Sequence, residues 1–343
     1  MWWLALGAGA QTPPDAWARI DDGDVIVLRP VGAAFDEGFS NADDGTGAPF
    51  DRAIERALED RTTLPDFVAV YISAGQPRLI FGATAFHKTY NRRLEGVGPN
   101  ERENTRIPIR AGLYLNRPST FAALPDGFAS WIFQHEVGHY WLARVRIDVG
   151  QGRDDGLLGR GQSHWNYFLD TGGSPLEGNR WIDNGDGSFT TWPVQGGFSD
   201  LDLYLMGLLP PEEVEPFFVI DPTDPNGRTR TSSPDPDWLF RPTTVHGVRI
   251  DLSVDDVIAA EGPVRPAYGE APTNFTVLTV LVVGPEEIID PEDFVRIDGL
   301  HTQYTKDWSV ATRTRSQMTF TPPQDRFAVP PIDAPAYIPK AAR

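Results

Sequence analysis

Apolar positions in the first third of the chain follow the spacing of strands and of one short helix. Residues 50–61 place Ile54, Ala57 and Leu58 on one face of a helix, which predicts an amphipathic helix there. Apolar runs rich in β-branched and aromatic residues predict strands. Four segments have this character: 24–28, 66–74, 79–87 and 110–116. We therefore expect a small sheet before the first long helix.

The segment 127–145 changes to helical spacing. Its large apolar and aromatic side chains, beginning with Phe128, recur every three or four positions, so they share one face of a helix. His135 and His139 belong to this spacing. The predicted helix therefore displays two histidines one turn apart on the same side.

The second half of the chain is less regular. Residues 148–249 are rich in Gly, Pro, Asp and Trp with few periodic runs, which predicts loops and short strands instead of a second packed layer. Ser253 is placed to cap a helix over 254–260, because its hydroxyl can accept from a first-turn amide. Residues 275–283 form an apolar strand candidate, and 291–311 predict a helix with Pro in its first turn.

The composition excludes several kinds of binding partner and functional site. The formal net charge of -18 argues against a nucleic-acid partner, because phosphate binding needs a basic face. There are no cysteines, so disulfides, thiolate zinc sites and cysteine nucleophiles are excluded, and any metal must be held by His, Asp or Glu. No apolar run has the length of a membrane-spanning helix. We expect neither a nucleic-acid partner nor a membrane span.

The strongest chemical signal is the segment His135-Glu136-Val137-Gly138-His139. Histidines four apart on a helix can present two imidazole nitrogens to one cation. The carboxylate of Glu136 lies beside them and can take a proton from a metal-activated water as it attacks a carbonyl. The pattern predicts a catalytic metal site in which His135 and His139 are ligands and Glu136 is the general base. The alternative is a helix whose histidines are hydrogen-bonded core residues.

Catalytic zinc usually takes three protein ligands, so a third donor is expected outside this helix. A compact continuation with a third histidine six residues after the second one is absent, since Leu142 and Val145 occupy the diagnostic positions. His164 follows the helix by a loop long enough to return to it, and we expect it to be the third ligand. Glu177 and Asp170 remain alternatives, because a downstream carboxylate can complete such a site.

Other polar residues are candidates for supporting roles. Tyr140, Tyr167 and Tyr204 each carry a phenol that can donate to an oxyanion, and their spacing does not choose among them. Met206 lies in a Leu-Met-Gly-Leu setting that fits either a methionine floor under the metal or, as we prefer, ordinary core packing.

Three further features have structural explanations that we favour. Residues 183–187 (DNGDG) resemble a calcium loop but lack its acidic ends, so we expect a hairpin turn. The polar run 91–93 (NRR) is expected to form a solvated loop, with an arginine near the cleft as the functional alternative. We expect surface or core roles for His87, His246 and His301.

The motifs together resemble the zincin superfamily of zinc metallopeptidases. The HEVGH helix preceded by strands carries this resemblance. A longer pattern is similar to uncharacterised bacterial secreted zincin-like proteins over residues 67–318. It comprises GVG at 96–98, HEVGHYW at 135–141, SHWNYFLDTGG at 163–173 and FSDLDLYLMGLLPPEEV at 198–214.

The resemblance implies a fold and a mechanism. It implies an α+β, zincin-like fold with a twisted mixed sheet, in which an edge strand at 112–116 lines the cleft and pairs with an extended substrate. It transfers the role of zinc ligand to His135 and His139, that of general base to Glu136 and, less directly, that of third ligand to His164. Neither the metzincin nor the standard gluzincin continuation is present, which leaves the subfamily open.

These inferences give an expected organisation and location. The apolar residues 1–10 end in a small-residue run typical of a secretory leader, although no basic residue precedes them, and we expect a secreted or periplasmic protein. We expect four segments: a leader at 1–23, an N-terminal zincin lobe with the active-site helix at 24–147, a loop-rich and helical C-terminal lobe supplying the third ligand at 148–320, and a Pro-rich tail at 321–343.

The expected function is a zinc-dependent peptidase that acts on polypeptides, with Zn²⁺ as its cofactor. One alternative is a zinc amidase or deacylase that acts on non-protein amides. The other is a catalytically inactive zincin-fold binding module, against which the presence of Glu136 argues.

Overall fold

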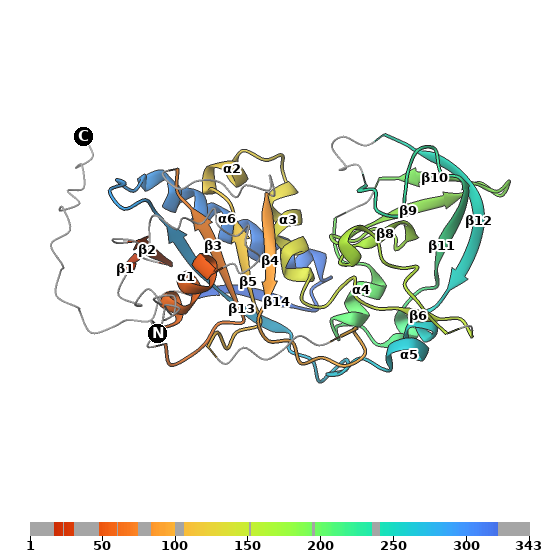
Figure 1. The fold of residues 1–343 in the computed structure, drawn as a ribbon, viewed down its shortest axis with the longest axis horizontal. Coiled ribbons are helices and arrows are strands. Elements are labelled where there is room, and N and C mark those ends of the chain that lie inside the picture. Colours follow the sequence, from red (N-terminus) through yellow and green to blue (C-terminus); the bar gives the residue numbers. More distant parts are fainter. Residues whose placement is uncertain are drawn as a thin grey trace, which may run out of the picture.

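A computed structural model shows a sheet lobe and a barrel lobe side by side (Figure 1). The structure describes residues 17–22, 24–30, 48–59, 61–74, 84–99, 106–150, 152–193, 196–234 and 241–321. Apart from 17–22 and Thr321, the predicted leader and the predicted Pro-rich tail lie outside these residues. Helices and strands are mixed along the chain, in agreement with the predicted α+β class at this coarse level.

The sheet lobe is built on a seven-stranded mixed sheet, and a mixed sheet was predicted. Its central strands run parallel, while the first pair and the last pair are antiparallel. The strands, in spatial order, are β1 (Trp17–Asp22), β2 (Val25–Pro30), β13 (Asn274–Val282), β3 (Phe67–Ile72), β5 (Ala111–Leu115) and β4 (Ala85–Thr89), with β14 (Gln317–Thr321) paired to β13.

Helices cover both faces of this sheet. One face packs against α1 (Ala48–Leu58), and the other packs against α2 (Pro118–Ala122), α3 (Phe128–Gly138) and α6 (Pro291–Ala311). Every residue of β3 is buried, because alternate side chains enter the two cores. Burial on both faces explains why this strand is continuously apolar in the sequence.

The last part of the chain returns to the first sheet. We expected residues 148–320 to form one C-terminal lobe, but β13, α6 and β14 all belong to the sheet lobe. β13 pairs in parallel with β2, β3 and β14, so it lies near the middle of the sheet. Its partners β2 and β3 lie more than 200 residues earlier in the chain, and no local pattern can reveal such pairing.

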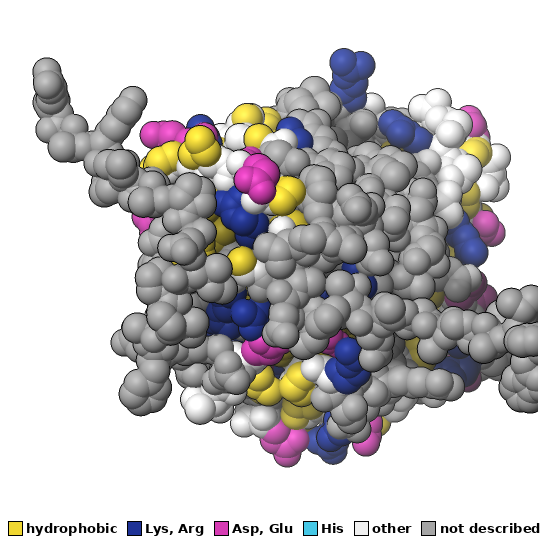
Figure 2. Space-filling view, turned by 60° about the vertical axis from the view of Figure 1, so that its left-hand side comes forward, with side chains coloured by type: hydrophobic (Ala, Val, Ile, Leu, Met, Phe, Trp, Pro, Cys, Tyr) yellow, Lys and Arg dark blue, Asp and Glu magenta, His cyan; other side chains and the backbone are white. Residues whose placement is uncertain are grey.

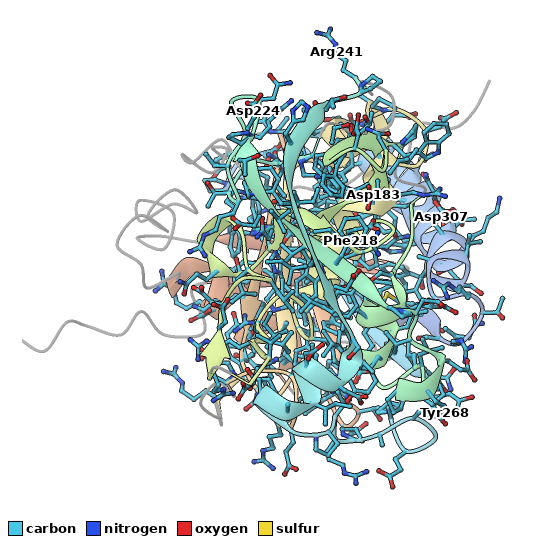
Figure 3. All side chains as sticks on the ribbon, turned by 90° about the vertical axis from the view of Figure 1, so that its right-hand side faces the viewer. Asp183, Phe218, Asp224, Arg241, Tyr268 and Asp307 are labelled. Atoms are coloured by element: carbon cyan, nitrogen blue, oxygen red, sulfur yellow. The ribbon has the colours of Figure 1, made fainter. Side chains whose placement is uncertain are left out.

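The middle of the chain forms a closed five-stranded barrel, which corrects the expectation of a loop-rich, helical lobe without a second packed layer. The barrel order is β10 (Ser188–Trp192), β12 (Thr244–Leu252), β11 (Phe217–Asp224), β8 (Trp165–Asp170) and β9 (Glu177–Asp183). Figure 3 views this lobe from its outer side, with Phe218 near the centre. The barrel core is small and mainly aromatic: Tyr167, Phe168, Trp181, Phe189, Phe218, Ile220 and Val245. The strands are short and separated by Gly- and Pro-rich turns, so the sequence pattern did not predict this core.

Short elements connect the barrel to the sheet lobe. They are β6 (Ile147–Asp148), β7 (Arg153–Asp154), the 3-10 turns η4 (Arg160–Gln162) and η5 (Pro211–Glu213), α4 (Asp200–Leu205) and α5 (Val254–Glu261). The predicted start of α5 is confirmed, and the carboxylate of Asp256 accepts from the backbone N–H of Ser253 (2.7 Å). Ser199 and Asp202 form a capping box on α4, and Asp202 also accepts from the Trp165 indole (2.9 Å). These contacts tie α4 to the barrel.

The surface mixes charges of both signs. Figure 2 shows basic and acidic side chains interspersed with apolar ones among the described residues of the face in view. Within the described part of the chain, no helix combines the length and the apolar character needed to cross a membrane.

Candidate metal centre

Helix α3 carries the two predicted helical ligands at its C-terminal end. His135 lies in the last turn, and His139 is the C-cap residue, whose N–H still donates to the His135 carbonyl (3.2 Å). The prediction of helix to residue 145 is therefore too long. The chain leaves the helix in a turn that includes Ala143 at a φ of 55°. Because both histidines precede this turn, they keep the one-turn spacing that places their rings together.

Gly138 allows the barrel side of the molecule to approach this helix closely. A Cβ at Gly138 would lie 2.4 Å from Cδ2 of Leu176, whose side chain is fully buried. The neighbouring Pro175 carbonyl accepts from Nδ1 of His135 (2.7 Å). The glycine inside the motif therefore brings the segment before β9 against the ligand helix.

The structure places the three histidines predicted as ligands in one cluster. Nε2 of His135 lies 3.1 Å from Nε2 of His139 and 3.2 Å from Nε2 of His164. Potential ligand atoms of all three residues lie within 4.8 Å of one another, and each residue is more than 90% buried. Tetrahedral zinc with Zn–N bonds near 2.0–2.1 Å requires N···N separations of about 3.3 Å. The observed spacing fits such an ion.

Second hydrogen bonds orient two of these rings. Nδ1–H of His135 donates to the Pro175 carbonyl, and Nδ1–H of His164 donates to the Arg160 carbonyl (2.8 Å). This tautomer leaves the Nε2 lone pairs directed into the cluster. Burial lowers the pKa of His135 to about 3 and lowers the pKa values of His139 and His164. The imidazoles are therefore neutral near pH 7, which is the form that binds metal.

Glu136 lies between the two helical histidines in sequence and is buried. Burial raises the pKa of its carboxyl to about 8, and the charge of Arg160 acts in the opposite direction. No group among the described residues donates a hydrogen bond to its side chain. Such a carboxyl can exchange a proton near neutral pH, as a general base must.

The two alternative third ligands have other partners. The carboxylate of Glu177 accepts from Arg160 (2.6 Å) and from the Ser233 hydroxyl (3.2 Å). Asp170 accepts from the backbone N–H groups of Gly172 and Trp181, which closes the turn after β8. Neither belongs to the cluster of three possible metal ligands.

The tyrosines and the methionine are engaged in structural contacts. The phenol of Tyr140 meets Arg110 (3.2 Å), Tyr167 packs in the barrel core, and Tyr204 accepts from the Val264 N–H (3.3 Å). Met206 is a buried member of the main core, as core packing requires.

Among the described residues, strand β4 forms the edge of the sheet beyond β5, and the segment 112–116 does not. The segment 112–116 contributes to β5, which lies between β3 and β4, so the expectation that it is an edge strand was wrong. His87 of β4 donates from Nδ1 to the Glu136 carbonyl (2.6 Å) and bonds Thr89 through Nε2 (2.8 Å). This histidine is partly buried and hydrogen-bonded, and it fixes the edge strand to the ligand helix.

Arg92 corrects the prediction of a solvated loop at 91–93. Its side chain is 1% exposed and donates to the carbonyls of Tyr140 (2.7 Å), Val97 and Pro99. It therefore secures the chain immediately after His139. A run of polar residues gives no sign of this role, because the acceptors are backbone carbonyls.

The remaining candidates behave as expected. Residues 184–187 form the hairpin between antiparallel strands β9 and β10, with Gly185 N–H donating to Asp183 (2.9 Å). His246 is exposed beside Asp224, whereas His301 is a core residue bonded to Thr279 (2.8 Å).

The donor set consists of three imidazoles without thiolate, and it could hold a metal ion. The carboxyl group of Glu136 directly follows the first imidazole donor in the sequence. Comparison of the chain with protein-family models, with curated proteins and with solved structures gives no match.

Proposed function

We propose that this protein is a zinc-dependent peptidase. The observation that carries the proposal is the convergence of three neutral Nε2 atoms, from His135, His139 and His164, beside the buried Glu136. The motif HEVGH and its resemblance to zincin metallopeptidases support the same reading. Buried histidines with only a structural role would not need three Nε2 atoms directed at one point.

The protein groups have distinct roles in this proposal. The three histidines hold the zinc ion, which when bound supplies Lewis acidity and lowers the pKa of water. Glu136 takes a proton from the attacking water, whose oxygen forms a bond to the amide carbon. The C–N bond then breaks, and Glu136 passes the proton to the leaving nitrogen. His87 keeps the Glu136 backbone in place through its hydrogen bond to the carbonyl.

Strand β4 favours an extended polypeptide over a small amide as the substrate. Among the described residues it is the last strand of the sheet, and it pairs only with β5. An edge strand offers backbone N–H and C=O groups that can pair with an extended chain. Because His87 ties β4 to Glu136, such a chain would lie beside the histidine cluster.

Metal analysis combined with a peptide-library digest tests the proposal. We expect one zinc per chain and cleavage of peptides, with Glu136→Gln retaining the metal while losing nearly all hydrolysis. His246→Ala is the matched control, because this histidine is exposed on the barrel. Undiminished turnover by Glu136→Gln would refute the assigned base. Zinc binding with cleavage of N-acyl compounds and not of peptides would favour the amidase.

A further inference from the structure

A guanidinium lies against the histidine cluster. Arg160, in η4, donates from Nη2 to Nε2 of His164 (2.8 Å), the atom proposed to bind the metal, so a bound ion would take this lone pair and release the N–H. Its side chain is about half exposed. Within the described residues, Nη1 makes no hydrogen bond. Arg160 therefore presents N–H donors beside the point on which the three Nε2 atoms converge.

Glu177 holds this guanidinium in place. Its Oε1 accepts from Nε (3.1 Å) and Nη2 (2.6 Å) of Arg160, as well as from Ser233. Two hydrogen bonds from one guanidinium fix its plane, which a single contact would not. Glu177 is 3% exposed, so the pair is firmly anchored on one side.

The backbone at Glu177 is strained in a way that this role explains. Its φ is 70°, in the left-handed region that non-glycine residues seldom adopt. The β8–β9 register is also interrupted between Trp165 and Asp170. Strain and bulges of this kind often aim a side chain at a functional site. The second oxygen, Oε2, is buried and has no partner within the described part of the chain.

Arg160 also acts on the candidate base. Burial raises the pKa of Glu136, and the positive charge of Arg160 opposes this rise. A positive donor beside the cluster is well suited to the oxygen of the carbonyl under attack. Negative charge develops there while Glu136 removes the proton from water.

We propose that Arg160 is a catalytic residue that donates to the scissile carbonyl oxygen as it becomes anionic, and that Glu177 is its positioning residue. The inference rests on the proposed hydrolase function. It assigns the electrophile of the reaction to the barrel side of the site. The competing explanation is that Arg160 only neutralises the buried Glu177.

The test uses the metal-loaded full chain with two probes, a phosphinic pseudopeptide and the corresponding peptide substrate. For Arg160→Gln we expect kcat to fall by about 10² to 10³, the loss typical of one oxyanion donor. The affinity for the phosphinic pseudopeptide, measured by calorimetry, should fall by the same factor, while KM changes about threefold or less and zinc content is unchanged. Arg160→Lys should recover part of both losses.

Arg160→Gln leaves Glu177 buried without its charge partner, which can destabilise the fold. The double variant Arg160→Gln/Glu177→Gln removes both charges and should fold while showing the same loss. Glu177→Gln alone should lose less than Arg160→Gln. Full kcat and full phosphinic affinity in the folded double variant would overturn the proposal, as would loss of zinc in place of loss of kcat.

A failure of the role assigned to Arg160 can be distinguished from a failure of the proposed peptidase function. Inorganic phosphate binding to the zinc-loaded protein reports the anion site without any turnover. If the wild type binds zinc but cleaves no peptide, the peptidase proposal fails. Phosphate affinity at least about tenfold weaker in the double variant would then still assign anion binding to Arg160, and equal affinity would reject it.

Discussion

The two halves of the candidate site are built very differently. The sheet-lobe half is a regular helix, in which His135 and His139 keep the one-turn spacing, and it rests on the large core between α3, α6 and the sheet. The barrel-side half consists of a 3-10 turn, a bulged strand pair and a residue at positive φ, and it contributes His164, Arg160 and Glu177. The helix supplies fixed spacing, whereas the irregular half aims individual side chains. Substitutions in the helix and in the irregular half should therefore affect the site differently.

Removing a histidine from either half should have the largest effect. His139→Ala and His164→Ala should each lower zinc affinity by more than the roughly ten- to hundredfold typical of losing a group that only hydrogen-bonds to a metal ligand, and both should abolish hydrolysis. Metal titration with a competing chelator measures this. His164→Ala should leave the secondary structure intact, because the residue lies between η4 and β8 and not within a helix or a strand. If His164→Ala binds zinc as tightly as the parent, the third ligand lies elsewhere, with Glu177 the next candidate.

The same contrast explains which parts of the site the sequence predicts. His135, Glu136 and His139 follow from helical periodicity, since a spacing of four residues places side chains on one face whatever the tertiary fold. His164 was inferred from loop length, and the structure places it with the helical pair. Arg160 was not identified, because its position depends on an ion pair with Glu177 seventeen residues away.

The fold, too, has parts that the sequence predicts and parts that it does not. Strands β3 and β5 and helices α1 and α6 were recognisable because each buries a periodic or continuous apolar pattern. The closed barrel was missed, since its strands are short and its core of seven residues is assembled from five separated segments. The true edge strand was also misassigned, because strand order is set by long-range pairing. Hydrophobic periodicity therefore predicts individual helices and strands, but not which of them pair or pack together.

Arg92 offers a way to weaken the sheet-lobe half alone. Arg92→Met removes the donors to three backbone carbonyls in a buried site, at about 1–3 kcal/mol for each acceptor left unpaired. We expect the free energy of unfolding to fall by about 3 to 5 kcal/mol and zinc affinity to fall with it, because the chain after His139 loses its anchor. Urea denaturation measures the first effect. Arg93→Met, at the exposed neighbour, should change stability little, and a loss in both variants would contradict the assigned role.

The two lobes should also differ in their response to pH. Burial lowers the pKa of His301, on the sheet lobe, from its usual 6.5 to about 4. The unfolded chain therefore takes up this proton first as the pH falls. The contribution of neutral His301 to the free energy of unfolding is fully present above pH 6.5. It is lost progressively between about 6.5 and 4, by about 3 kcal/mol in total. Urea denaturation of the metal-free protein at pH 7 and pH 5 measures roughly half of it. His301→Gln should remove only this part of the pH dependence, because His135 and the other buried histidines also contribute, whereas His246→Gln, on the barrel surface, should leave the dependence unchanged.

The smallest predicted effect concerns the contact between the lobes. Gly138→Ala directs a methyl group at Leu176 Cδ2, and the strain should exceed the gain in helix propensity, leaving a net loss of about 1 to 2 kcal/mol. Gly299→Ala in α6 is the matched control, because a Cβ there meets open space, and it should stabilise the protein by up to about 1 kcal/mol. In a Leu176→Ala background the cost of Gly138→Ala should shrink, since the obstructing atom is gone. An unchanged cost in that background would show that the two halves of the site do not meet at Gly138.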